Sequence, residues 1–256
     1  MTRYRRIASE FGAAWRAFLR RRTAVFFTFF FPVIIVVIFG ALVQTRPTGG
    51  GLFAEPPGYY LPGYLAVVVL FTPLSRVGSE VARHREGHRF EKLATTPLRR
   101  WEWLLAQTLV NVVVIGLAAL LLLALTVLVT PATVPLRPAT LLLVPFVAIG
   151  VALFCGVGAV LGRVADSQDG VVAASNALAL PLLFLSETFV TPDLLPAWFR
   201  PIVSLSPLSY FARGVRGLTY DPAAAGALGV VGSLAVLTAV AVVCAVAGAV
   251  SIPRTD

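Results

Sequence analysis

Residues Leu104 to Val129 read LLAQTLVNVVVIGLAALLLLALTVLV, a run of 26 residues without a charged side chain. A helix needs about 20 consecutive apolar residues to cross the roughly 30 Å hydrocarbon core of a bilayer. The run is longer than that, so it predicts a transmembrane helix. The composition agrees, because only 13% of the residues are charged and the mean hydropathy is +0.86, whereas about a quarter of a soluble domain is charged.

Five further apolar runs predict the other spans. Three are as long as a span requires, and two have 17 residues each, close to the lower limit. The runs are Thr23 to Val43, Tyr59 to Ser75, Ala139 to Gly162, Gly170 to Ser186 and Ala223 to Ile252. We therefore expect an all-α integral membrane protein with six transmembrane helices in a single domain, residues 1–256. Cys155 and Cys244 fall inside two of the runs and are expected to be small packing residues.

The segment just before the opening run is the most highly charged part of the chain. It reads RHREGHRFEKLATTPLRR from Arg83 to Arg100, and residues 76–102 hold seven of the 21 Lys/Arg and four of the 12 Asp/Glu. Such a charge density is too costly inside hydrocarbon, so the segment lies outside the bilayer. We predict that this loop is where the protein meets a soluble partner.

Basic residues are distributed unevenly between the two sides of the predicted membrane. With six spans, 16 Lys/Arg fall on one side and five on the other. The positive-inside rule then places both termini and the 76–102 loop in the cytoplasm of a multi-pass cell-membrane protein. This topology also accounts for the net charge of +9, so no nucleic acid partner is expected.

Residues 1–22 form a separate N-terminal element. Ile7, Phe11, Trp15 and Phe18 recur at helical spacing, whereas the arginines lie mostly off that stripe. The pattern predicts an amphipathic interfacial helix whose arginines face lipid phosphates. We expect this helix to anchor the first span. The alternative is that it contacts a partner protein directly.

Residues 187–222 are unusually apolar and aromatic for a loop outside the membrane. The segment is broken into short pieces by Pro192, Pro196, Pro201 and Pro207, which favours an external re-entrant helical hairpin. We expect it to close the outer end of a path through the membrane, with a static cap on the helices as the alternative. The candidate gate residues are Pro196, Trp198, Pro207, Tyr210 and Arg216.

The sequence offers little chemistry of its own. It lacks the GxxxxGK[ST] loop that cradles ATP phosphates and the HExxH metalloprotease motif. His84 and His88 could share a helix face with Glu80, but an ion-paired, solvated helix explains them as well, so no metal or cofactor is predicted.

Charged residues are nearly absent from the predicted spans, which disfavours proton-coupled transport. Glu187 falls at the outer end of the fifth span, where it is expected to reach water. Gly158 and Gly162 are spaced for close helix packing, within or between subunits. Polar residues inside the spans either bond to neighbouring helices or line a substrate path; they are Gln107, Asn111, Ser175 and Asn176.

Three short motifs occur in the order of a known family. The first is Tyr60-Leu61-Pro62-Gly63 at the start of the second span. The second is Arg85-Glu86-Gly87, with Glu91, Leu93 and Thr96-Pro97 after it. The third runs from Leu195-Pro196 and Trp198 to Pro207-Leu208-Ser209-Tyr210 and Arg216. Together they resemble the membrane subunits of ATP-binding-cassette exporters of the type-2 permease family. His88 and Ser206 depart from the family pattern, where threonine and asparagine are commoner.

The resemblance implies a permease rather than an enzyme. ATP would be hydrolysed by a separate cytoplasmic ATPase subunit, and a second permease copy or a related chain would complete the transporter. The charged loop would form a coupling helix, with Gly87 allowing a sharp entry and Pro97 ending the helix. The coupling residues would be Arg85, Glu86, Gly87, Glu91, Leu93, Thr96 and Pro97.

Substrates exported by this family include drugs, polysaccharides and lipids. Two other interpretations of the sequence stay open. One is a membrane-embedded enzyme that modifies lipids, and the other is a membrane partner of an ATPase that does not itself transport.

Overall fold

The computed structural model describes residues 2–38, 55–132, 134–135, 137–189, 196, 198 and 200–253. Within these ranges the chain is helical and has no β-strand. The helices, with η marking short 3₁₀ segments, are α1 (Arg3–Arg20), α2 (Arg22–Ile35), α3 (Pro57–Glu86), α4 (Arg89–Ala94), α5 (Arg100–Val129), η2 (Pro138–Leu142), α6 (Leu143–Val164), α7 (Gln168–Phe184), α8 (Arg200–Leu205), α9 (Pro207–Thr219), η4 (Pro222–Ala225) and α10 (Gly229–Ser251).

Four helical stretches in the described ranges are long and apolar enough to cross a membrane. They are α3, α5, Pro138–Val164 and Pro222–Ser251. A fifth candidate is the pair α1 and α2, which meet at an angle of 81°. The all-α membrane architecture is therefore confirmed. The count of six stays a prediction, because α7 has only 17 residues.

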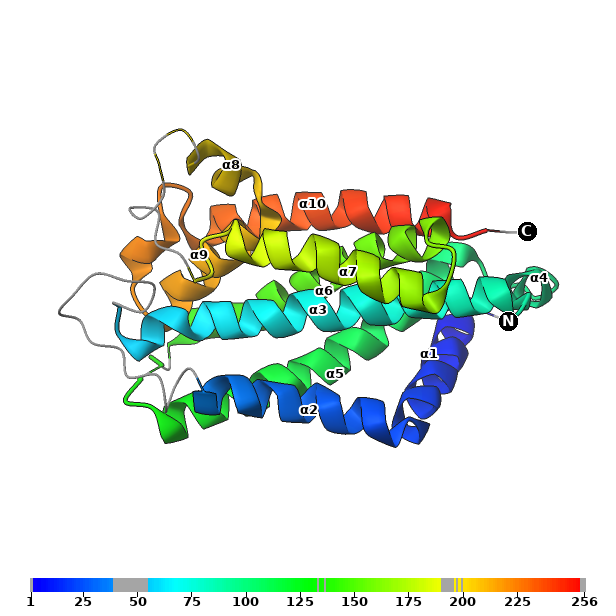
Figure 1. Cartoon of the computed structure of the whole chain (residues 1–256), viewed down its shortest axis with the longest axis horizontal. Helices are drawn as coiled ribbons and strands as arrows, with labels where there is room; N and C mark the ends of the chain where they lie inside the picture. Colours follow the sequence, from blue (N-terminus) through cyan, green and yellow to red (C-terminus); the bar gives the residue numbers. More distant parts are fainter. Residues whose placement is uncertain are drawn as a thin grey trace.

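α6 lies at the centre of the bundle and packs against both α3 and α10 (Figure 1). Its glycines make this possible. A Cβ at Gly158 would collide with the backbone carbonyl of Leu74, and one at Gly162 would collide with that of Gly78 on α3. The small residues singled out in the sequence thus allow close packing between helices of the same chain.

The two ends of the bundle carry different structures (Figure 1). α4, the start of α1 and the end of α10 lie at one end. α8, α9, η4 and the start of α3 lie at the other. The loops predicted to be cytoplasmic and external are therefore separated along the long axis of the molecule.

Two helix boundaries differ from the predicted spans for clear physical reasons. α3 continues past Ser75 to Glu86, because residues such as Ala82, Glu80 and Arg83 favour a helix as well as apolar ones do. α10 begins at Gly229 rather than Ala223. Gly226 and Gly229 both have positive φ angles, which end η4 and start a new helix direction. The end of the first predicted span, from residue 39, lies outside the described residues.

Candidate functional site

The charged segment forms the end of α3, the short helix α4 and the start of α5. α3 ends at Glu86, and the chain turns before α4 begins at Arg89. The left-handed position in this turn is His88, with φ 50° and ψ 33°, while Gly87 has an ordinary φ of −94°. The expectation that Gly87 provides the sharp entry is therefore wrong. Histidine is among the non-glycine residues that tolerate this conformation best.

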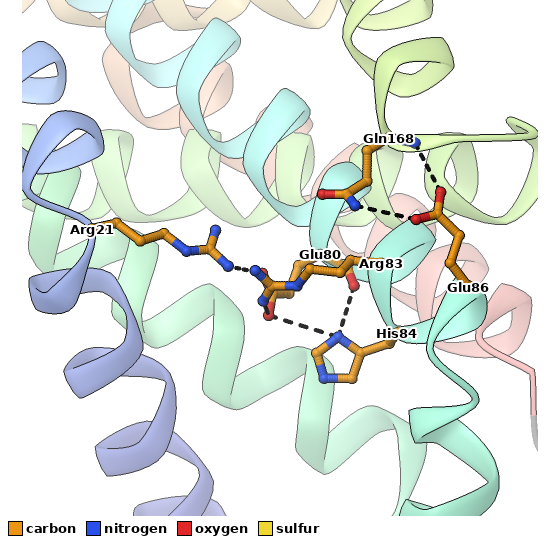
Figure 2. A network of polar contacts seen from close by, with 6 residues as sticks. All are labelled: Arg21, Glu80, Arg83, His84, Glu86 and Gln168. Atoms are coloured by element: carbon orange, nitrogen blue, oxygen red, sulfur yellow. Dashed lines mark hydrogen bonds and ion pairs between the residues drawn. The ribbon is translucent and has the colours of Figure 1, made fainter.

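Glu80 is the centre of a polar network on α3 (Figure 2). Its carboxylate pairs with Arg83 one turn later and with Arg21, whose Nη2 lies 3.5 Å from Oε2. Arg21 is the residue at the bend between α1 and α2. His84 Nδ1 donates to the backbone carbonyl of Glu80 at 2.8 Å. The network therefore attaches the α1–α2 bend to α3.

Arg85 and Glu86 extend this network to two further helices. Arg85 Nη1 donates hydrogen bonds of 2.8–3.0 Å to the carbonyls of Gly162, Arg163 and Ala165. These carbonyls lie at the C-terminal end of α6. Glu86 accepts hydrogen bonds from the backbone N and Nε2 of Gln168, the first residue of α7, at 3.1 and 3.2 Å (Figure 2). A cation at a helix C-terminus and an anion at an N-terminus both match the helix dipoles.

An aromatic cluster fixes α4 to the bundle. Phe90 is buried, and its ring centroid lies 5.3 Å from that of His84 and 5.4 Å from that of Trp103. The His84 and Trp103 rings are 5.4 Å apart. One apolar residue of α4 is thus inserted between α3 and α5. His84 and His88 have separate surroundings, because His88 is exposed and pairs with Glu91 at 3.1 Å.

The N-terminal helix is held by an ion pair that the sequence did not predict. Arg6 Nε donates to Glu102 Oε2 at 3.0 Å, and the Glu102 side chain is fully buried. Arg6 was expected to face lipid, but it binds the start of α5 instead. Arg5, Arg16 and Arg20 are exposed, as a helix lying on a charged interface requires.

The remaining predicted coupling residues lie on the outer side of α4 and the loop after it. Glu91, Thr96 and Pro97 are exposed, and Leu93 is half-buried. Thr96 Oγ1 donates to the Leu93 carbonyl at 2.7 Å, and Pro97 follows the end of the helix as a stop residue should. A groove of about 1020 Å³ runs between this loop and the end of α10. Leu93, Thr96 and Pro97 line it together with Trp101 and Val250.

The polar residues proposed for a substrate path do not form one cluster. Asn111 is buried, and its Nδ2 donates to the Gln107 carbonyl at 2.9 Å on α5. On α7, Ser175 is buried but Asn176 is exposed. Among the residues that the structure describes, the α5 pair and the α7 pair are not joined by a hydrogen bond, and no group of His, Cys, Asp and Glu is arranged to hold a metal ion.

Arg216 holds α9 in place. This α9 side chain is only 3% exposed. Its Nη2 donates to the carbonyl of Glu187 at 2.7 Å and its Nε to that of Tyr59 at 3.3 Å. The guanidinium also lies 4.0 Å from the centroid of the Tyr59 ring. One arginine thus connects α9 to the start of α3 and to the chain just after α7.

The Glu187 carboxylate does not reach water as expected. Its side chain is 8% exposed and forms an ion pair with Arg213, whose Nε lies 2.6 Å from Oε2. The other gate candidates differ in burial. Trp198 is 73% exposed and Pro196 is exposed, whereas Pro207 opens α9 and Tyr210 is half-buried beside Arg213. Leu195 of the third motif lies outside the described residues.

Comparison with known proteins agrees with this arrangement. The family model described as ABC-2 type transporter matches residues 9–220. The daunorubicin resistance ABC transporter permease protein DrrB1 of Streptomyces coeruleorubidus is 37% identical over 73 residues, which are 28% of this chain and 26% of that relative. The match thus covers about a quarter of the relative. Because the family model covers most of the chain, including α4 and α9, this protein belongs to the ABC-2 type transporter family of membrane permeases.

Proposed function

We propose that this chain is the permease subunit of an ATP-driven exporter and that α4 docks on a separate ATP-binding-cassette ATPase. The observation that carries the proposal is the two-sided character of α4. Phe90 is buried against α3 and α5, while Arg89, Glu91 and Lys92 of the same helix are exposed. A short helix that is anchored on one side and polar on the other is suited to transmit movement from a partner.

The contacts around α4 suggest how such movement would reach the membrane. His84 and Phe90 link α4 to α3, and Glu80 links α3 to the bend between α1 and α2. Arg85 and Glu86 link the same turn of α3 to α6 and α7. A displacement of α4 would therefore act on four helices through one segment of α3. In this scheme Arg85 and Glu86 work within the permease, and Glu91 is the charged residue that meets the ATPase.

We infer six spans, with α7 as the fifth and α10 as the sixth, and both termini in the cytoplasm of the cell membrane. Single cysteines at Thr95 and Ala223, which are exposed at opposite ends, test this in a variant lacking Cys155 and Cys244. An impermeant thiol reagent should label only the Ala223 site in intact cells. Labelling of the Thr95 site under the same conditions would reverse the orientation.

Six spans form half of a translocation unit, so two copies, or this chain and a related one, would assemble. The path would include Gln107, Asn111, Ser175 and Asn176, and the hairpin with Pro196, Trp198, Pro207, Tyr210 and Arg216 would close its outer end. The spans offer an apolar lining with few polar groups. The relative named above is a daunorubicin resistance permease, so we propose an amphipathic drug or lipid as the substrate.

Co-expression with a candidate ATPase subunit provides the main test. The two proteins should purify together, and inside-out vesicles that contain both should accumulate an amphipathic dye only when ATP is present. Co-purification without ATP-dependent accumulation would instead favour a membrane partner that does not transport.

A further inference from the structure

A pocket of about 460 Å³ lies where α1, α2, α3 and α5 meet. This volume falls within the roughly 300–1,000 Å³ typical of small-molecule sites. One wall is aromatic and comes from Phe18, Phe27 and Phe31. The polar part of the lining includes Arg76 and Gln107. The pocket can therefore hold a molecule that has one polar and one apolar part.

The guanidinium of Arg76 has fewer hydrogen-bond acceptors around it than a partly buried arginine normally has. It lies 4.3 Å from the centroid of the Phe18 ring, which is a favourable cation–π distance. Its Nη1 is buried and has no hydrogen-bond partner among the described residues. Buried N–H groups of charged side chains are usually paired, because leaving them without an acceptor is costly. An acceptor supplied by a ligand would remove this cost.

The acidic groups nearby do not provide that acceptor. Glu80 also lines the pocket, but its carboxylate is taken by Arg21 and Arg83. Glu10 lies close to Glu80 and Gln107, and burial raises the pKa of its carboxyl, which makes it a weaker source of negative charge. The pocket therefore presents an arginine that interacts with Glu80 through space but whose Nη1 has no acceptor in the described part of the chain.

The aromatic wall continues onto a surface that suits lipid tails. Phe27 and Phe31 line the pocket and are nevertheless 58% and 44% exposed. Phe26 and Phe30 on the same helix are also largely exposed. In an integral membrane protein, such a face of α2 lies against hydrocarbon, whereas Arg76 directly follows the apolar part of α3. The pocket thus opens from an apolar surface toward a cation at one membrane boundary.

We infer that this pocket binds a phospholipid, with the phosphate accepting hydrogen bonds from Arg76 and an acyl chain lying on Phe27 and Phe31. Arginine is well suited to phosphate because its planar fork can donate two parallel hydrogen bonds. The assignment to the cytoplasmic leaflet rests on the proposed orientation. Binding itself requires neither an ATPase nor transport.

Native mass spectrometry of the purified full chain tests the inference, with phosphatidylglycerol and diacylglycerol of identical acyl chains as probes. Phosphatidylglycerol should bind more tightly than diacylglycerol. Arg76→Gln should weaken phosphatidylglycerol binding about tenfold or more, the change expected when a charge-assisted hydrogen bond is lost. Arg89→Gln removes an exposed arginine of α4 and serves as the matched control, with binding unchanged.

A second variant keeps the inference testable if Arg76→Gln fails to fold. Ala24→Phe places bulk in the pocket and leaves Arg76 intact, so it should also reduce phosphatidylglycerol binding. Equal binding of the two probes, or Arg76→Gln binding as well as Arg89→Gln does, would overturn the inference. Inorganic phosphate that binds as tightly as phosphatidylglycerol would show that the site takes a free anion and that the acyl chains contribute nothing, which would also overturn the inference. Because no ATP is involved, these outcomes are independent of whether the chain transports.

Discussion

Charged residues hold α9 and the end of α3 in different ways. At the end with α8 and α9, Arg216 and Glu187 are buried and connect α9 to the start of α3 and to the chain just after α7. At the end with α4, Glu102 is also buried and paired with Arg6, but the contacts of Arg21, Arg85 and Glu86 around the end of α3 are exposed or only partly buried. Buried charges are expensive to separate, while exposed pairs exchange readily with water. The comparison suggests that α9 is firmly fixed, whereas the turn from α3 to α4 can rearrange.

The largest effect is expected from Arg216→Leu. The substitution leaves the buried carbonyls of Glu187 and Tyr59 without their donor, at about 1–3 kcal/mol each. We expect a loss of about 3 kcal/mol, seen as a clear drop in the temperature at which the detergent-solubilised protein stays monodisperse. Arg22→Leu at the exposed start of α2 is the control and should change little. If both variants melted alike, the fixation of α9 would not depend on Arg216.

A double-mutant cycle on Glu187 and Arg213 should give the next largest effect. Each single change, Glu187→Gln or Arg213→Gln, leaves its partner charged in a mostly buried place. Combining them should destabilise the protein by less than the sum, with a coupling of about 1–3 kcal/mol. The cycle is measured by thermal unfolding of the four proteins under identical conditions. Additive losses would mean that the pair contributes nothing beyond its separate contacts.

Arg85→Ala tests the other end of the molecule and should cost less, about 1–2 kcal/mol. It removes hydrogen bonds to the last carbonyls of α6 and the favourable interaction of a cation with that helix end. Arg85→Lys keeps the charge on a shorter side chain, so it should recover part of the loss. A loss as large as that of Arg216→Leu would contradict the proposed difference between the two ends.

The sequence predicted the elements of this fold better than their contacts. The run from Leu104 to Val129 lies within α5, and the run from Gly170 to Ser186 nearly coincides with α7. Periodicity and the length of an apolar run are local properties of the sequence, so they can be recognised without knowing which helices pack together. The end of α3 was harder to predict, because the helix continues beyond its apolar part into a charged stretch that includes Glu80.

The contacts of the candidate site were less accessible to sequence reasoning. Residues 85–97 were identified by their motif, but the partners of Arg85 and Glu86 lie near residue 165, roughly 80 positions away. Arg6 and Glu102 are likewise far apart in the sequence. Only one hint existed, namely that charges at the edges of apolar runs are often placed to meet helix ends.

The smallest effect on stability and the largest on function should come from Glu91→Arg. Glu91 is exposed and its pair with His88 is a surface contact, so reversing the charge should change stability by less than about 1 kcal/mol. If α4 docks on the ATPase through this residue, the variant should nevertheless lose co-purification and ATP-dependent dye accumulation.

Lys92→Glu, one residue further along α4, is the matched control and should keep most of the co-purification and of the dye accumulation. Equal loss in the two variants would reveal a general charge effect on α4. Full activity of Glu91→Arg would leave α4 without its proposed contact and direct attention to the groove beside Trp101.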